Sequence, residues 1–152
     1  MSAPLTPTER HVWRSVIQMA DLLRFRIEAE VKPVSRLSPA DHAVLMHIDE
    51  APGQQIGQQS LANAMYWSKS RLSHHLTRMQ ARGLVLRGSA DDGSGVRIFL
   101  TEAGTQMVRT AEGPHAKAVR QHLFQVATEE ELTALIRLAD RLATQVDGRV
   151  PY

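Results

Sequence analysis

The sequence contains no cysteine. It therefore has no disulfide framework, no thiolate metal site, no cysteine nucleophile and no thiol redox switch. Long apolar runs are also missing, since no segment approaches the roughly 18 consecutive apolar residues of a membrane span. Residues 1–8 lack the basic and apolar regions of a signal peptide. These absences favour a cytoplasmic protein with no membrane partner.

An excess of charge of either sign is missing as well. The 18 Lys and Arg residues and 16 Asp and Glu residues leave a formal net charge of +2, which is too small to identify a partner. Signatures of catalysis are equally scarce, because no glycine-rich phosphate loop and no obvious pair of catalytic carboxylates is present. Ser94 stands between two glycines but lacks the strand-to-helix setting of a nucleophilic serine. We expect neither an enzyme nor a bound cofactor.

The histidines do not form a metal-binding pattern. His42 and His47 are five residues apart, and His74 and His75 are adjacent, so neither pair shares one face of a helix. Without cysteine, a metal site would need carboxylates to converge from elsewhere in the chain. We therefore expect no metal site.

The chain does contain enough apolar residues to fold. With 152 residues, of which 43% are hydrophobic, it can bury one core, so we expect a single domain over residues 1–152. Helix starts are marked by three capping boxes, in which a Ser or Thr is followed three residues later by Glu or Asp. These boxes begin at Thr6, Ser38 and Thr128.

The capping signals and the spacing of apolar residues predict the helices. The first should cover residues 6–32 and stop before Pro33. Another begins at Thr101, should be disturbed at Gly113-Pro114, and ends near Val126. The remaining helices are predicted over residues 38–50, 58–65, 69–82 and 128–146.

The periodicity changes after Gly83. Residues 84–86 and 96–100 are short apolar or β-branched runs, separated by a polar, glycine-rich segment. This pattern predicts a β-hairpin with a polar tip. Residues 38–100 thus place helices, a turn, a further helix and a hairpin in the order of a winged helix-turn-helix, in which a helix enters the major groove of DNA. The expected fold is mainly α, with a DNA-binding lobe over residues 38–100.

The candidate recognition helix, residues 69–82, has an apolar face of Leu72, Leu76 and Met79. Its other faces carry hydroxyls, imidazoles and cations, which can hydrogen-bond base edges or phosphates of double-stranded DNA. The predicted DNA-binding set adds the preceding serine and three residues of the hairpin. It comprises Ser68, Lys69, Ser70, Arg71, Ser73, His74, His75, Thr77, Arg78, Arg82, Arg87, Ser94 and Arg97.

The distribution of charge supports this set. Between Tyr66 and Arg97, six Lys and Arg residues stand against two Asp residues, which gives a net charge of +4 and leaves −2 for the rest of the chain. A basic helix alone is more often a solvated face. Here the turn, the basic helix and the hairpin occur together, which favours DNA binding.

The same residues carry a resemblance to a known family. Leu61-Ala62, the run from Ser68 to Leu76, the segment Met79 to Val85 and the segment Leu100 to Gly104 resemble motifs of the multiple antibiotic resistance regulator family, MarR. The resemblance spans residues 12–146 approximately. It implies a transcriptional regulator, expected to be a repressor associated with the nucleoid. It also implies an obligate homodimer that binds pseudo-palindromic DNA and is usually released by a small ligand.

The wing departs from the family's pattern. Members commonly carry an arginine at the hairpin tip that enters the minor groove, but here the tip reads Asp92-Gly93-Ser94-Gly95. Arg97, or Arg87 on the opposite strand, is therefore the candidate to take the place of the missing tip arginine.

The long flanking helices, residues 6–32 and 101–147, are the predicted dimerisation helices. Their apolar stripes are longer than a central unit of about 60 residues could cover alone. Packing on each other within one chain is the alternative to a homodimer. The MarR resemblance also implies a ligand crevice between the dimer region and the DNA-reading lobe, suited to a small aromatic or acidic metabolite. Its candidate residues are His11, Trp13, Arg14, Asp41, His42 and Met46.

A competing hypothesis is a helical interaction module whose winged unit binds a protein partner. DNA binding that falls steeply with added salt would favour the regulator over this alternative, because phosphate contacts release counterions.

Overall fold

The computed structural model describes residues 3–89 and 95–145. Most of these residues are helical, and the strands form one small sheet, which confirms the predicted fold class. Within the described residues, no helix combines the length and apolar character that crossing a bilayer requires. The elements are α1 (Pro7–Ser35), α2 (Pro39–Asp49), η1 (Pro52–Gln54), β1 (Gln55–Gly57), α3 (Gln58–Ala64), α4 (Lys69–Ala81), β2 (Val85–Ser89), β3 (Val96–Leu100), α5 (Glu102–Val119), η2 (Arg120–Phe124) and α6 (Glu129–Thr144).

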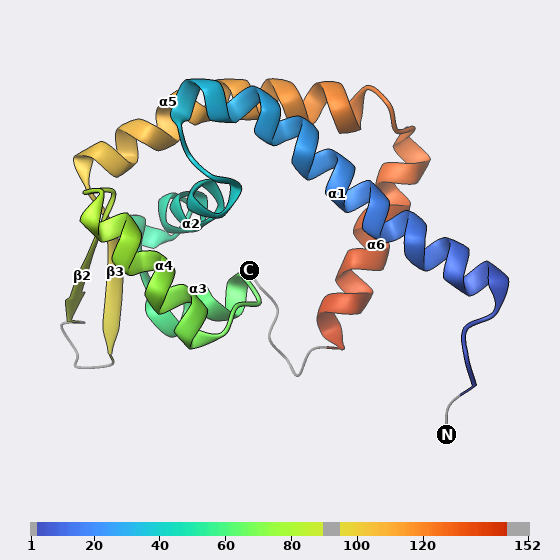
Figure 1. The fold of residues 1–152 in the computed structure, drawn as a ribbon, viewed down its shortest axis with the longest axis horizontal. Coiled ribbons are helices and arrows are strands. Elements are labelled where there is room, and N and C mark those ends of the chain that lie inside the picture. The colour runs from blue at the N-terminus through green and yellow to red at the C-terminus, as the bar shows by residue number, and fades with distance from the viewer. Residues whose placement is uncertain (1–2, 90–94, 146–152) are drawn as a thin grey trace.

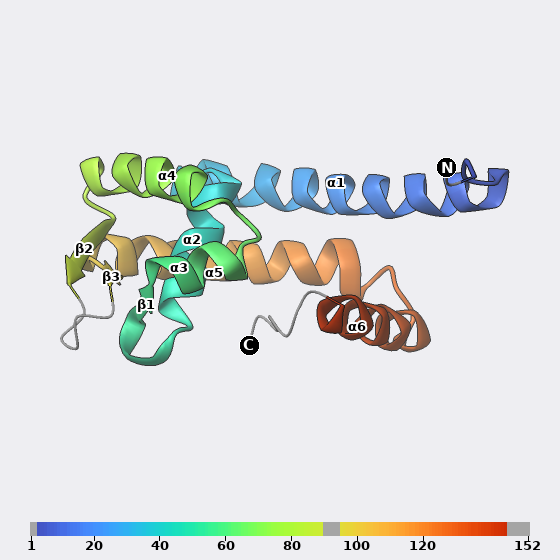
Figure 2. The ribbon, with the colours of Figure 1, turned by 90° about the horizontal axis from the view of Figure 1, so that it is seen from below.

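These elements divide between a lobe and an arm (Figure 1). The lobe contains α2, α3, α4 and the sheet, whereas the arm contains α1, α5, η2 and α6. Helices α1 and α5 lie side by side where they join the lobe. At the far end of the arm, α6 crosses α1 at a different height, as Figure 2 shows from below.

Each of the three predicted capping boxes is present and confirmed. At the first, the Thr6 hydroxyl accepts from the Glu9 backbone N–H at 3.2 Å, and the Glu9 carboxylate accepts from the Thr6 N–H at 2.7 Å. Reciprocal bonds of this kind satisfy backbone donors that a helix leaves unpaired at its first turn. They account for the accuracy with which these helix starts are predicted.

Two prolines lie inside helices that were expected to stop or break at them. Helix α1 continues through Pro33 to Ser35, and α5 continues through Pro114. A proline removes one backbone hydrogen bond, and local side chains or packing can compensate for it. At the end of α1 the Ser35 hydroxyl donates to the Val31 carbonyl at 3.0 Å, and α5 packs along α1. The predicted interruptions are therefore wrong.

The predicted hairpin is confirmed as an antiparallel pair, with β2 and β3 in register from Val85 opposite Leu100 to Ser89 opposite Val96. Strand β1 was not predicted. It pairs antiparallel with the other edge of β3, which gives the strand order β1-β3-β2. Three residues are too few to show an alternating pattern, so this strand depends on the presence of β3. The predicted tip residues 90–94 lie outside the described residues.

The lobe has its own hydrophobic core, to which the near ends of α1 and α5 contribute. Leu45, Leu72 and Ile98 are fully buried at its centre, and Val31 of α1 and Ala111 of α5 close it from the arm. The far part of the arm is different. Helix α6 has no buried residue within the described chain.

Candidate nucleic-acid interface

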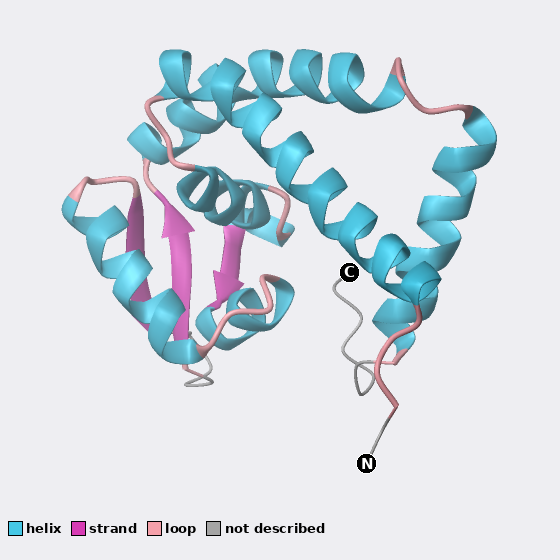
Figure 3. Ribbon diagram, turned by 45° about the vertical axis from the view of Figure 1, so that its right-hand side comes forward, coloured by secondary structure: helices cyan, strands magenta, loops and turns pink. Residues whose placement is uncertain are grey.

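Helix α4 lies along the outer side of the lobe (Figure 3). Leu72, Leu76 and Met79 are buried, which confirms the predicted inward face. The Ser68 hydroxyl caps the helix by accepting from the Arg71 backbone N–H at 3.2 Å. Ser73 is half-buried, and the other predicted DNA-binding residues of the helix, apart from His75, are exposed. These are Lys69, Ser70, Arg71, His74, Thr77, Arg78 and Arg82.

His75 does not lie on an outward flank as expected, because it is only 8% exposed. It follows Leu72 by three residues and precedes Met79 by four, so it continues the apolar face of the helix. Its Nε2 lies 3.1 Å from Asp41 Oδ1 of α2, and its Nδ1 lies 3.0 Å from Arg78 Nη2. The expected outward position of His75 is therefore wrong.

Asp41 holds the C-terminal end of α4 against the first turn of α2. Its side chain is buried, and Oδ2 accepts from Arg82 Nη1 at 2.7 Å and from the Ser38 backbone N–H at 3.1 Å. Burial by itself raises the pKa of the Asp41 carboxyl, but the hydrogen bonds from Arg82 and Ser38 outweigh burial and leave the pKa below its usual value. Asp41 is therefore a charged anchor for Arg82.

Trp67 supports the first turn of α4. Its ring packs against the core. The Arg71 guanidinium stacks over this ring, 4.1 Å from its centroid. A cation over an aromatic face is attracted by the ring's quadrupole. Arg71 is therefore held in place while its side chain remains exposed.

Arg87 of β2 is folded back onto α4. Its Nη2 donates to the Ser73 carbonyl at 2.6 Å, and both terminal nitrogens lie 3.2 Å from Thr77 Oγ1. The Thr77 hydroxyl in turn donates to the Ser73 carbonyl at 3.0 Å. Antiparallel strand β2 passes directly beside α4, so this guanidinium ties the wing to the helix.

Arg97 lies on β3 and shares a cleft with Lys69, so the structure brings these two predicted cations together. The cleft has a volume of about 580 Å³ and lies between β3 and the start of α3. Ser94 lies outside the described residues. The opposite wall of the cleft carries polar residues that were not predicted from the sequence, although the glutamine-rich run at 54–59 was a signal for them. They are Gln55, Gln58, Gln59 and Ser60.

The six predicted ligand-binding residues do not form one site. Trp13 and Arg14 line a shallow groove on α1 itself, and His11 is exposed on the same helix. Asp41 belongs to the network that holds α4, and Met46 packs against the core of the lobe. His42 alone among the six lines a cavity between the lobe and the arm. Helix α1 extends along the arm, so its first turns lie away from α2 (Figure 1).

The His42 cavity has a volume of about 240 Å³ and lies between α1, α2 and α5. The His42 ring contacts the His115 ring, with 4.6 Å between their centroids. Burial, reinforced by the nearby His115, lowers the pKa of His42 to about 4, and burial also lowers the pKa of His115. Both rings are therefore neutral at pH 7. The cationic groups of the lining are Arg24 and Lys32.

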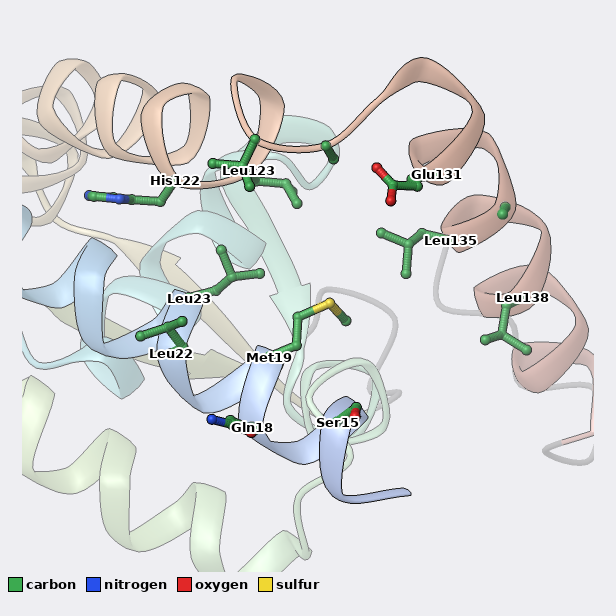
Figure 4. A pocket seen from close by; sticks show the side chains of 13 residues that line it. Ser15, Gln18, Met19, Leu22, Leu23, His122, Leu123, Glu131, Leu135 and Leu138 are labelled. Carbon is green, nitrogen blue, oxygen red and sulfur yellow. The ribbon is translucent and has the colours of Figure 1, made fainter. Parts of the chain in front are cut away.

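A larger groove of about 670 Å³ separates α1 from α6 and η2 in the arm. Met19, Leu135 and Leu138 point into it (Figure 4). At its end near the lobe, His122 Nε2 lies 2.8 Å from Glu30 Oε1, which ties η2 to α1. The lining is mainly apolar, so this groove resembles an uncovered interface more than a polar binding site.

A sequence profile of the MarR family matches residues 37–93. The structure is similar to that of AbsC, a MarR family transcriptional regulator from Streptomyces coelicolor, with a TM-score of 0.87. The two sequences are 32% identical, and the match covers 97% of this chain and 99% of AbsC. The chain belongs to the MarR family.

Other MarR structures share the fold. Sco3205, a MarR family transcriptional regulator from Streptomyces coelicolor, was solved in complex with DNA, and its TM-score to this structure is 0.87. The two sequences are 26% identical, and the match covers 100% of this chain and 98% of Sco3205. A mutant MarR from E. coli complexed with operator DNA is 18% identical, with 92% of this chain and 99% of that chain covered and a TM-score of 0.79. Comparison with curated protein sequences finds no match. This MarR family member is a DNA-binding transcriptional regulator, in a family of regulators rather than enzymes.

Proposed function

We propose that this MarR regulator acts as a homodimeric repressor, that α4 enters the major groove of a pseudo-palindromic operator, and that a small ligand lowers its affinity for DNA. The observation that carries the proposal is the exposed face of α4, where three arginines are each anchored at one point. Arg71 stacks on Trp67, Arg78 contacts His75 and Arg82 is bonded to Asp41. Side chains that are already held lose less conformational entropy when they bind.

The side chains of the lobe, residues 38–100, support a division of roles. Ser70 and His74 are exposed on α4 and carry groups that can hydrogen-bond base edges. Lys69 and Arg97 line one cleft, which suits a phosphate backbone passing between α4 and the wing. The Thr77 hydroxyl is already bonded to Ser73 and Arg87, so its methyl group is the part left for contact with a thymine methyl.

Replacing Arg78 with alanine should weaken operator binding roughly tenfold and reduce the slope of log affinity against log salt by about 2. The reason is the loss of one cation from the DNA-facing side of α4 in each subunit of the dimer. Replacing Ser70 with alanine should instead change the preference among operator variants, because a hydroxyl reads bases and adds no charge. Fluorescence anisotropy on labelled duplexes at several salt concentrations measures both effects.

Arg109→Ala is the matched control for the Arg78 variant, because it removes the same charge from an exposed position of α5 in the arm. It should bind operator as the parent does. If R78A and R109A bind equally well, α4 is not the helix that contacts DNA. A parent protein whose binding hardly depends on salt would favour the protein-interaction module instead.

The dimerisation helices of the proposal, residues 6–32 and 101–147, are supported by what a single chain leaves uncovered. Leu22, Ile136 and Leu142 are each more than half exposed. Helix α6 buries no residue within the described chain, although most of the stability of a helix in a protein comes from packing of its apolar face. A second copy would bring the same apolar helices to cover the groove between α1 and α6, as two-fold symmetry requires.

Modulation by a ligand is supported by the cavity that contains His42 and His115. Its two neutral imidazole rings, tilted by 39° to each other, suit an aromatic group, and Arg24 and Lys32 suit an anionic one. RdhR-CbdbA1625, which has the same fold with a TM-score of 0.78, was solved in a 2,4-dichlorophenol bound form. Ser38 lines the cavity and also bonds to Asp41, so movement of this turn would reach the anchor of Arg82.

Benzoate or 2,4-dichlorophenol should lower operator affinity at least fivefold at saturation, since coupling between two sites is typically of this size or larger. Benzyl alcohol, which has the ring without an acidic group, is the control and should have a smaller effect. Arg24→Gln should weaken the response to benzoate. Anisotropy measures operator affinity, and calorimetry measures ligand affinity, which must fall by the same factor when DNA is bound. An unchanged operator affinity with both probes would exclude aromatic anions as the ligand class of this cavity.

A further inference from the structure

A buried histidine lies directly beneath the DNA-facing side of α4. The ring of His75 stands between two charged groups: Nε2 is 3.1 Å from Asp41 Oδ1, and Nδ1 is 3.0 Å from Arg78 Nη2. The Trp67 ring packs edge-on against it, with 5.3 Å between the ring centroids. The imidazole therefore joins a buried carboxylate to an exposed arginine on the DNA-facing side.

Arg78 determines which ring nitrogen carries the proton. A guanidinium group has only donors, so Nδ1 must accept from it, and the proton of the neutral ring lies on Nε2. That nitrogen faces Asp41. The Nε2 contact with Asp41 falls short of hydrogen-bond geometry, so the carboxylate stabilises this tautomer electrostatically. The ring thus presents a lone pair toward Arg78 and a polarised N–H toward Asp41.

We propose that His75 is a positioning residue for DNA binding, whose Nδ1 lone pair holds the Arg78 guanidinium in the orientation that contacts the operator. The inference rests on the proposed function, because it assumes that Arg78 faces DNA. Without the acceptor at Nδ1, the long side chain of Arg78 would sample other rotamers and lose more conformational entropy on binding. The effect would appear in DNA affinity even though His75 itself is buried.

Protonation of His75 would reverse this contact. An imidazolium ring carries an N–H on Nδ1 as well, which would face the donors of Arg78. The new charge would lie near Arg71, Arg78 and Arg82, opposed by the carboxylate of Asp41. Burial lowers the pKa of His75; Asp41 raises it, whereas Arg78 and Arg71 lower it further, so the net shift is downward. The ring is neutral at pH 7, and the contact is lost as the pH falls through the lowered pKa.

Two variants of similar shape separate the roles of the two nitrogens. His75→Asn places its amide near the position of Nδ1 and keeps an acceptor for Arg78. His75→Gln places its amide near the position of Nε2 and keeps a donor toward Asp41, without the acceptor at Nδ1. We expect H75N to bind operator within about threefold of the parent. We expect H75Q to bind roughly tenfold more weakly, as R78A does.

A double-mutant cycle shows whether His75 acts through Arg78. In the parent, Arg78→Ala should weaken operator binding roughly tenfold. In the H75Q background the same change should have less than about a threefold effect, because Arg78 is already released. The control is a second cycle that combines H75Q with Arg97→Ala on the wing. In that cycle the double variant should lose operator affinity by the product of the two single-variant factors. Circular dichroism establishes that each variant is folded.

The same inference can be tested without changing His75. The ratio of parent to R78A affinity should fall as the pH is lowered toward the His75 titration, because protonation releases Arg78 in the parent alone. Other groups that titrate in this range are present in both proteins, so their effects cancel in the ratio. This measurement decides the question if H75Q does not fold.

The outcomes separate the inference from the proposed function. If R78A binds operator like the parent, the assignment of α4 to DNA fails, and the inference fails with it. Suppose instead that Arg78→Ala weakens operator binding by the same factor in the parent and in the H75Q background, and that the ratio of parent to R78A affinity is independent of pH. Then His75 does not position Arg78. The proposed function then stands.

Discussion

Replacing Gly104 with alanine should destabilise the protein by about 3 kcal/mol, the upper part of the range for overpacking. Gly104 lies in the first turn of α5, and a Cβ there would overlap the carbonyl oxygen of Leu84. That carbonyl cannot move freely, because it accepts from the backbone N–H and the hydroxyl of Thr101 at 3.2 and 3.1 Å. The close approach joins α5 to the chain between α4 and β2, so relief of the overlap would displace the wing.

Urea unfolding followed by circular dichroism measures this loss, and Gly113→Ala is the matched control. Gly113 lies in the same helix, and a Cβ there would meet nothing within 4 Å. G113A should remain within about 1 kcal/mol of the parent, because alanine gains helix propensity but also precedes a proline. Equal stability of G104A and G113A would contradict the steric argument.

Replacing Leu138 with glutamate should raise the dissociation constant of the homodimer at least about 100-fold, since an uncompensated buried charge is strongly unfavourable. Leu138 lines the groove between α1 and α6, which the proposed second copy covers (Figure 4). Because the side chain is exposed in the single chain, the monomer should remain folded. Sedimentation equilibrium measures the dissociation constant. Affinity for a palindromic operator should fall as well, because one lobe would bind a half-site alone.

Thr133→Glu controls for the added charge on α6. Thr133 is exposed and does not belong to the lining of the groove. T133E should therefore dimerise like the parent. A parent protein that sediments as a monomer at micromolar concentration would refute the dimer, and equal dimerisation of L138E and T133E would move the interface elsewhere.

The parts of the fold that follow local rules were predictable. The three capping boxes begin helices where expected, and the hairpin is in place. Local signals failed at Pro33 and Pro114. A proline by itself favours the end of a helix, but tertiary packing keeps both helices continuous here. Strand β1 was missed because three residues carry no periodic signal and the strand exists by pairing with β3.

The candidate site was predictable in its elements and less so in its side chains. The apolar spacing of α4 placed Leu72 inward correctly. His75 lies at the edge of that apolar spacing, and the sequence did not indicate that it would be buried. In the structure it faces the buried carboxylate of Asp41 in α2. The role of Arg87 depends on β2 passing beside α4, which brings its guanidinium to the Ser73 carbonyl. Such pairings join residues that are distant in sequence, so no local pattern reports them.

The sequence by itself determined that this protein is a cysteine-free winged-helix chain whose net positive charge is concentrated between Tyr66 and Arg97. Composition, capping motifs and periodicity are local properties, so they can be read from the order of the residues alone. The tertiary structure alone decided which cations are free and which are anchored, because ion pairs form between segments that the fold brings together. It also decided which apolar faces remain uncovered. Helix α6 has an apolar stripe in the sequence, but only the folded chain shows that no residue of this helix is fully buried by the rest of the chain.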